Sequence, residues 1–247
     1  MKFPAPLIRG TLIKRYKRFL ADVLLEDGRE VVAHCANSGS MLTVCEPGSE
    51  VWLSPAANRD RKLQFSWELI RVGRSLVGIN TMHPNKLAAE AISDGTIVEL
   101  QSYATLRREV KYGRNSRIDL LLESPARPPC FVEVKNVTLM RNKAFAEFPD
   151  SVTARGAKHL DELIDQVALG NRAVMLYLAQ RGDCTSFAPA DDIDPAYAKG
   201  LIAARRAGVE VLAYGCRVTA KDIKVVKPMV FSALTEIEAR PLSAYMK

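Results

Sequence analysis

The chain has 247 residues, of which 48% are hydrophobic and 26% are charged. These values are ordinary for a globular protein, so they exclude a chain that is disordered over most of its length. The length also allows a sizeable core without disulfides or a structural metal. The formal net charge of +7 favours polyanionic partners, and DNA, RNA and anionic membrane surfaces all fit that charge.

The cysteines and the apolar segments bear on the cellular location. There are five cysteines, an odd number, and none shows the close pairing of a zinc site. Reduced, mostly buried thiols are the expected state, as in the cytoplasm. Residues 1–6 contain no apolar run of signal-peptide length, and no segment is long and apolar enough to cross a membrane. We therefore expect a cytoplasmic protein with no membrane partner.

The first third of the chain reads as short strands joined by turns. Asp27-Gly28 is a hairpin-type turn between two of them. The expected strands cover residues 7–14, 19–25, 30–35, 49–53 and 65–70. Short strands with no clear helix predict a small β domain, for which an OB-like barrel is the first choice. Another small barrel or sandwich would give much the same pattern.

The pattern changes near residue 80. Pro84 can open a helix that ends before Gly95. The elements expected after it are strands at 99–111, 117–123 and 131–137, a helix at 153–169, a strand at 173–178, a helix at 195–207 and a strand at 209–214. The prediction is a mixed α/β protein with a junction at residues 81–85. Residues 1–82 would form the barrel and residues 83–247 an α/β domain.

Asp119, Glu133 and Lys135 form the clearest candidate for a chemical site. Asp119 is the one carboxylate in the apolar segment 117–122, and a buried carboxylate is costly unless it is paired or bound to a metal. Glu133 and Lys135 alternate with valines on the next strand, so they share one face. An antiparallel hairpin through the intervening loop would bring both carboxylates and the ammonium group together.

This set suits metal-dependent hydrolysis of a phosphodiester. Asp119 and Glu133 would offer two oxygens to Mg²⁺ or Mn²⁺, the Val134 carbonyl a third, and Lys135 would stabilise negative charge or orient a water. Glu90, on the upstream helix, is a candidate third metal ligand, and Glu109 competes for that role. On these residues alone a plain buried salt bridge is favoured, because Glu-x-Lys is a common tripeptide.

Three basic segments are candidates for contacts with a nucleic-acid backbone. Their residues are Lys14, Arg15, Lys17 and Arg18; Lys111, Tyr112, Arg114 and Arg117; and Arg155, Lys158 and His159. The first segment interleaves aromatics with cations, but a solvated strand edge has the same pattern. Tyr112 could stack on a base or simply pack. The third opens a helix, where free amides and cations favour phosphate, although surface solubility is an equal alternative.

A polar loop follows the third expected strand, from His34 to Met41. It could hold a backbone turn or touch a phosphate. A catalytic pair of Cys35 with His34 is not expected, because adjacent side chains on a strand face opposite ways.

Several stretches together resemble the sugar fermentation stimulation protein A (SfsA) family over nearly the whole chain. They are residues 35–41, 78–81, 109–113, 116–119 and 132–139, and Phe148-Pro149-Asp150 through Arg155-Gly156 to Lys158-His159-Leu160. Ser151 departs from the alanine expected there. The resemblance implies an N-terminal OB-like domain and a C-terminal domain of the PD-(D/E)XK nuclease fold, whose motif falls on Asp119, Glu133 and Lys135.

The resemblance also implies largely non-specific DNA binding and a regulatory role in sugar metabolism, maltose use in particular. The leading hypothesis is a DNA-binding protein with a nuclease-type metal site, and RNA and a homodimer are left open as partners. The alternatives are an active Mg²⁺- or Mn²⁺-dependent nuclease and a transcription regulator without catalysis. No helix-turn-helix signature supports sequence-specific control.

Overall fold

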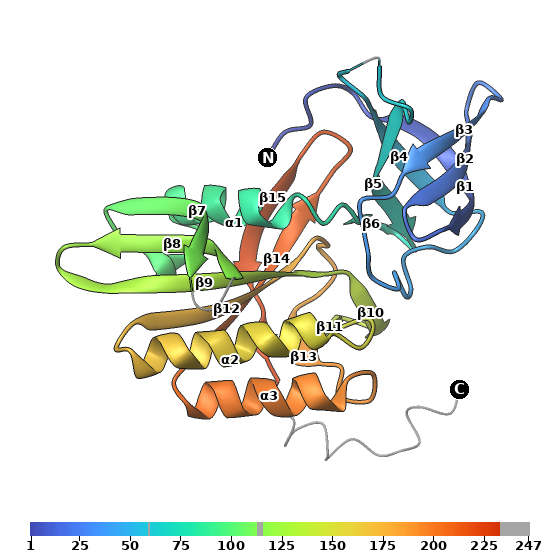
Figure 1. The fold of residues 1–247 in the computed structure, drawn as a ribbon. Coiled ribbons are helices and arrows are strands. Elements are labelled where there is room, and N and C mark those ends of the chain that lie inside the picture. Colours follow the sequence, from blue (N-terminus) through green and yellow to red (C-terminus); the bar gives the residue numbers. More distant parts are fainter. Residues whose placement is uncertain (59, 113–115, 233–247) are drawn as a thin grey trace.

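The computed structural model describes residues 1–58, 60–112 and 116–232. Figure 1 shows a β-barrel at the N-terminal end and an α/β domain built on a larger sheet. The mixed α/β class predicted from the sequence is confirmed, including the order of its main helices and strands.

The barrel contains the short strands that the first third of the sequence predicts, and one more. They are β1 (Ile8–Tyr16), β2 (Leu20–Leu25), β3 (Glu30–His34), β4 (Glu50–Pro55), β5 (Phe65–Val72) and β6 (Ser75–Gly78). The strand order is β3-β2-β1-β4-β5-β6, and a parallel pairing of β3 with β5 closes the barrel. Its interior is apolar, with Trp67, Leu12 and Val23 almost fully buried. This closed arrangement confirms the OB-like prediction.

The α/β domain is built on a second six-stranded sheet. Its strands are β7 (Thr105–Tyr112), β8 (Ser116–Ser124), β9 (Arg127–Val137), β12 (Arg172–Ala179), β14 (Glu210–Val218) and β15 (Ile223–Pro228), in the order β15-β14-β12-β9-β8-β7. β7, β8 and β9 form an antiparallel meander, whereas β12 runs parallel to both β9 and β14. β9 therefore lies inside the sheet with a partner on each side.

Helices cover both faces of this sheet, as Figure 1 shows. α1 (Pro84–Ser93) packs against β8, β9 and β15, while α2 (Ala154–Ala168) packs against β9, β12 and α3 (Pro195–Arg206). Thr153 caps α2 by accepting a hydrogen bond from the Gly156 amide, and Asp194 caps α3 in the same way. Most residues of β12 are buried and apolar, as expected for a strand that is covered on both faces of its sheet.

One predicted strand is wrong at its start. Residues 98–100 form a 3₁₀ helix, η1 (Val98–Leu100), and β7 begins only at Thr105. Ser102, between η1 and β7, has φ 69°, which is in the left-handed region and not the extended one. The side chain of Gln101 donates to the carbonyls of Ile92 and Ile97, and this ties the segment to the end of α1.

A small sheet that the sequence did not predict lies beside α2 and α3. It contains β10 (Leu139–Asn142), β11 (Phe145–Phe148), β13 (Ser186–Pro189) and β16 (Val230–Phe231). Each strand has four residues or fewer, too short to show a period of two in the sequence. β11 leads directly into the loop before α2 and so positions the start of that helix.

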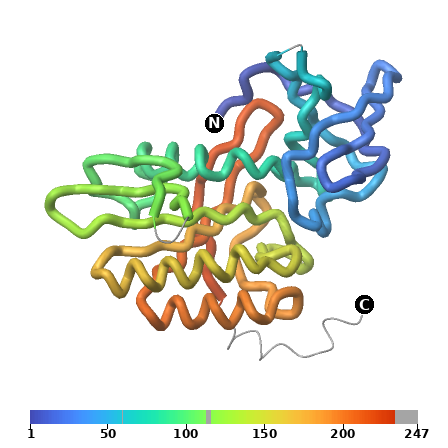
Figure 2. The backbone as a smooth tube through the Cα atoms, in the orientation of Figure 1, coloured from blue at the N-terminus to red at the C-terminus, as the bar shows by residue number. Residues whose placement is uncertain are grey.

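The barrel and the α/β domain are joined by direct contacts. Gly78 at the end of β6 donates its amide to the Gln180 carbonyl at 2.8 Å, and Val77 forms a bridge with Arg181. At the other end, the Met1 and Phe3 backbones bond to Ile223 and Lys221 beside β15, where Figure 2 shows the N-terminus. In the described part of the chain, no helix is long and apolar enough to cross a membrane.

Candidate metal and nucleic-acid site

The hairpin of β8 and β9 brings Asp119 and Glu133 together, as the sequence predicts. The β8–β9 register pairs Leu120 with Val132, so Asp119 and Glu133 are the next residues along each strand. Beyond that pair, the amide of Val134 donates to Asp119 Oδ2 at 2.8 Å. At the end of the β8–β9 pairing, the Val134 amide is therefore satisfied by a side-chain oxygen of Asp119. This hydrogen bond fixes the Asp119 carboxylate against β9.

Glu133 is held in a buried cluster with Lys135 and His159. Only 2% of Glu133 is exposed. Lys135 Nζ lies 2.7 Å from Glu133 Oε1 and 3.0 Å from His159 Nδ1, and His159 Nδ1 also hydrogen-bonds Glu133 Oε1. Glu133 Oε2 is buried and has no hydrogen-bond partner among the described residues. An unpaired carboxylate oxygen in a buried place calls for a cation or a donor that the protein itself does not supply.

The two carboxylates differ in their electrostatic balance. Burial and the nearby charge of Glu133 raise the pKa of Asp119 to about 6, against the hydrogen bonds from Val134 and Asn85. Burial also raises the pKa of Glu133, but the charge of Lys135 and the hydrogen bond with His159 outweigh it and leave that pKa lowered. In this acidic cluster of Asp119, Glu133, Lys135 and His159, the ionised form is therefore destabilised at Asp119 and stabilised at Glu133.

We expect the Asp119→Asn variant to be more stable than the parent in metal-free buffer at alkaline pH. A folded-state pKa raised from 3.8 to about 6 gives stability that is present below the unfolded pKa and is lost as pH rises through the folded one. The variant has no such loss, so its advantage should be about 2 kcal/mol larger at pH 8 than at pH 4. Urea unfolding in EDTA across this range measures the difference, and an advantage that does not change with pH would contradict the electrostatic reading.

Asn85 connects the carboxylate of Glu109 to the cluster, and the sequence pattern does not indicate this role for Asn85. Its side-chain amide donates to Asp119 Oδ1 at 2.7 Å and to Glu109 Oε1 at 2.9 Å. Glu109 has φ 55°, in the left-handed region, and the β7–β8 register omits the pair of Glu109 with Asp119. Strain of this kind in a non-glycine residue is stored where the surrounding structure imposes it, often at functional sites.

Glu90, predicted as a third metal ligand, is not brought to this cluster by the structure. It is on α1 with Asn85, but five residues later, which is roughly 140° around the helix. Glu90 is exposed and pairs with the Met1 amino group at 2.7 Å and with Lys86 at 4.0 Å. Of the two acids left open by the sequence, Glu109 is the one beside Asp119.

The described residues contain no group of three or more His, Cys, Asp or Glu side chains arranged to hold a metal ion. Asp119 and Glu133 are the two carboxylates on β8 and β9 that could hold a metal, and one oxygen of Glu133 is engaged by Lys135 and His159. Mg²⁺ needs few protein ligands because it keeps several waters, so two carboxylates are a sufficient donor set. The unpaired Glu133 Oε2 and the raised pKa of Asp119 both fit a bound cation.

The first basic segment is only partly available for a nucleic acid. Arg15 donates to the carbonyls of Asn37, Gly39 and Ser40, so its guanidinium holds a loop, contrary to its predicted role in backbone contact. Lys14 is exposed with Asp22 3.5 Å away. Lys17 and Arg18 are exposed in the β1–β2 turn with φ 47° and 65°.

The second basic segment borders the acidic cluster. Lys111 and Arg117 are exposed on β7 and β8, opposite each other in the register. The Tyr112 ring packs against Phe131 with centroids 5.7 Å apart, and its hydroxyl lies 3.4 Å from Glu162 Oε2, so of the two interpretations the structure shows packing. Burial raises the pKa of Tyr112. Arg114 lies outside the described residues.

Two residues of the third basic segment lie on the surface, and the third lies in the buried Glu133 cluster. Arg155 and Lys158 are exposed on the first turns of α2, as expected for phosphate contacts. His159, predicted as a nucleic-acid contact, is only 7% exposed and lies in the Glu133 cluster instead of on the surface. Arg155 Nε lies 3.3 Å from His159 Nε2 and links the exposed face to the buried cluster.

Comparison with known proteins gives the family. The model described as "SfsA N-terminal OB domain" matches residues 13–79, and the "Sugar fermentation stimulation protein RE domain" matches residues 82–222. The chain belongs to the SfsA family. The sugar fermentation stimulation protein homolog of Paramagnetospirillum magneticum is 59% identical over 236 residues, covering 96% of this chain and 99% of the relative. That of Rhodospirillum centenum is 59% identical over 233 residues, covering 94% and 100%.

A solved structure of the family has the same fold. Pyrococcus furiosus SfsA, in complex with Ca²⁺, superimposes with a TM-score of 0.84 at 26% identity. The superposition covers 94% of this chain and 98% of that one, so the likeness extends over the barrel and the α/β domain. The family predicted from sequence motifs is thereby confirmed.

Proposed function

We propose that this chain is a largely sequence-non-specific DNA-binding protein whose acidic cluster is a metal-dependent phosphodiesterase site. The observation that carries the proposal is the convergence of Asp119 and Glu133 with Lys135 on neighbouring strands. Exposed Lys111, Arg117 and Arg155 on the elements around the cluster would meet the phosphate backbone.

Asp119 and Glu133 would hold Mg²⁺ or Mn²⁺. A bound divalent ion would polarise a phosphate and lower the pKa of a water. Oxygen ligands are what such ions prefer, and the Pyrococcus furiosus relative is in complex with Ca²⁺, which also takes oxygen ligands. The unpaired Oε2 of Glu133 supports the same assignment.

The other residues of the cluster would orient these groups and stabilise charge. Asn85 and the Val134 amide fix both oxygens of Asp119. His159 fixes Glu133 from the α2 side. Lys135 Nζ, with a side chain only 12% exposed, would stabilise negative charge that develops on the phosphate.

The proposal is tested by incubating the protein with labelled single- and double-stranded DNA and RNA in Mg²⁺, Mn²⁺ or EDTA. We expect products with a divalent metal and none in EDTA. The Glu90→Gln variant is the matched control, because Glu90 is a carboxylate on α1 outside the cluster, and it should cut like the parent. Binding without cutting on all four substrates would overturn the hydrolytic part of the proposal.

Backbone binding predicts a steep dependence of affinity on salt. Each phosphate contact that is lost should reduce the slope of log K against log salt by about 1 on duplex DNA. We expect this reduction for Arg155→Gln and no change for Lys199→Gln, an exposed cation on α3. Fluorescence anisotropy from low to moderate salt measures both slopes. An affinity that is flat with salt in the parent would contradict backbone recognition.

A further inference from the structure

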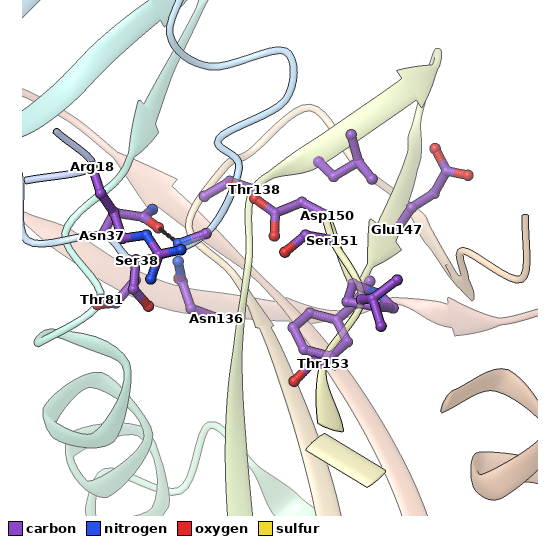
Figure 3. Close-up of a pocket in the computed structure, with 15 residues that line it drawn as sticks. Arg18, Asn37, Ser38, Thr81, Asn136, Thr138, Glu147, Asp150, Ser151 and Thr153 are labelled. Carbon is purple, nitrogen blue, oxygen red and sulfur yellow. Dashed lines mark hydrogen bonds between the residues drawn. The ribbon is translucent and has the colours of Figure 1, made fainter. Parts of the chain in front are cut away.

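A polar cavity of about 380 Å³ lies between the barrel and the α/β domain, beside the acidic cluster but separate from it. Figure 3 shows Arg18, Asn37 and Thr81 on its barrel side and Thr138, Asp150 and Ser151 across from them. Phe148, Pro149, Val152 and Leu139 supply an apolar part of the lining. The proposal for the acidic cluster gives this cavity no role.

The cavity is built by specific contacts between the two domains. Met41 donates its amide to Asp150 Oδ2 at 2.8 Å, and the Ser40 hydroxyl donates to the Asp150 carbonyl at 2.5 Å. A Cβ on Gly39 would lie 2.7 Å from Asp150 Oδ2, so only glycine allows this approach. Arg15 braces the same loop through its carbonyls. These contacts hold the barrel loop and the start of α2 at a fixed separation.

Arg18 is the cation that the cavity lining offers to an anionic ligand, while its two carboxylates, Glu147 and Asp150, are engaged by other groups. Glu147 pairs at 2.8 Å with Arg141, which also pairs with Asp192, and Asp150 accepts the Met41 amide. Among the residues that the structure describes, the side chains of Arg18, Ser38 and Ser151 make no hydrogen bond or ion pair. A guanidinium and two hydroxyls are thus available beside the apolar side chains of Phe148 and Val152. A nucleotide matches this set, because it combines an anionic phosphate, a polar base edge and an apolar base face.

The position of the cavity relates it to the acidic cluster. Asn136, which lines the cavity, is three residues beyond Glu133 on β9, roughly 10 Å along the strand. Thr153, which also lines it, is six residues before His159, roughly 9 Å along α2. Either separation is short enough for one nucleic-acid strand to reach both the cavity and the acidic cluster within a few nucleotides.

We propose that this cavity binds one unstacked nucleotide of a nucleic-acid strand, within a few nucleotides of the phosphate at the acidic cluster. The inference rests on the proposed function and adds a binding site to it. Arg18 would meet the phosphate of that nucleotide, and the hydroxyls of Ser38 and Ser151 would meet its base or sugar. A cavity that holds a single base would select single-stranded or locally opened substrates.

Photo-crosslinking tests the proposal in EDTA, so that cleavage plays no part. The probes are a single-stranded oligonucleotide that contains 4-thiothymidine and, separately, free 4-thiothymidine monophosphate, with crosslinked peptides mapped by mass spectrometry. We expect the oligonucleotide to crosslink within residues 136–153. Arg18→Gln and the cavity-filling Ser151→Trp should each reduce that crosslink about tenfold. Lys143→Gln, an exposed cation that does not line the cavity, should not.

The outcomes separate this inference from the proposed function. If anisotropy shows that the oligonucleotide does not bind at all, the proposed function fails. If it binds but crosslinks elsewhere, or if the crosslink survives in folded Ser151→Trp, the cavity proposal is wrong and backbone binding stands. A crosslink from free nucleotide but none from the oligonucleotide would also overturn the proposal, because the cavity would then serve a small molecule.

Discussion

The Glu133→Gln variant is expected to lose at least about 100-fold in the rate of metal-dependent cleavage, the scale of loss when a charged group at a reacting centre is removed. Glutamine keeps the shape of the side chain but removes the charge that would bind the metal. Glu133 is also the partner of Lys135 and His159, so the variant disturbs the contacts of both residues. Single-turnover cleavage of labelled DNA in Mn²⁺ measures the rate.

Controls for this variant separate chemistry from folding. Circular dichroism should show folded protein, and DNA affinity in EDTA should stay within about threefold of the parent, because the phosphate contacts lie on exposed cations. Glu90→Gln, outside the cluster, should cut at the parental rate. A Glu133→Gln rate close to that of the parent would show that this carboxylate is not part of the reaction.

Removal of the carboxylate of Asp183 is expected to lower the free energy of unfolding by about 3 kcal/mol, the cost of leaving a buried charge without its partner. The Arg181 side chain has 0% exposure and donates to Asp183 at 2.7 Å and 2.9 Å and to the Thr138 carbonyl at 2.7 Å. It lies at the domain junction, since its backbone pairs with Val77 of β6. Asp183→Ala would leave this guanidinium buried and unpaired.

A double-mutant cycle separates the interaction energy of the Arg181–Asp183 pair from the effect of each single substitution. Arg181→Met should cost less than Asp183→Ala, because Asp183 is 25% exposed and can be hydrated once the guanidinium is gone. The double variant should be more stable than Asp183→Ala alone. Burial raises the pKa of Asp183, but Arg181 outweighs it and leaves the pKa lowered. The stability from this pair is therefore present above the unfolded pKa and lost as pH falls. Equal costs for all three variants in urea unfolding would contradict this assignment.

The sequence predicted the main architecture because long periodic elements carry a strong signal. The helices predicted at residues 153–169 and 195–207 are present as α2 and α3, and the β8–β9 hairpin places Asp119 beside Glu133. The four strands of the small sheet have no such signal, because each depends on pairing with a distant neighbour. Local pattern cannot encode that pairing.

Individual roles at the site were harder to predict than their location. The sequence does not distinguish Glu90 from Glu109 as the third acid of the site. The structure favours Glu109, because the Asn85 side chain on α1 donates to it and its backbone has a left-handed φ. His159 and Arg15 look like surface cations, but tertiary contacts with Glu133 and with the loop at 37–40 engage them. Burial and partners across the fold decide what a charged side chain does.

The central claim is that Asp119 and Glu133 bind a divalent cation that serves phosphodiester chemistry. Anomalous diffraction from crystals soaked in Mn²⁺ tests it most directly. We predict a peak between the two carboxylates, at about 2.0–2.3 Å from an oxygen of each, and no such peak in Asp119→Asn crystals. Full Mn²⁺ occupancy elsewhere, with Lys135 still bound to Glu133 and no peak in the cluster, would show a structural salt bridge instead of a metal site.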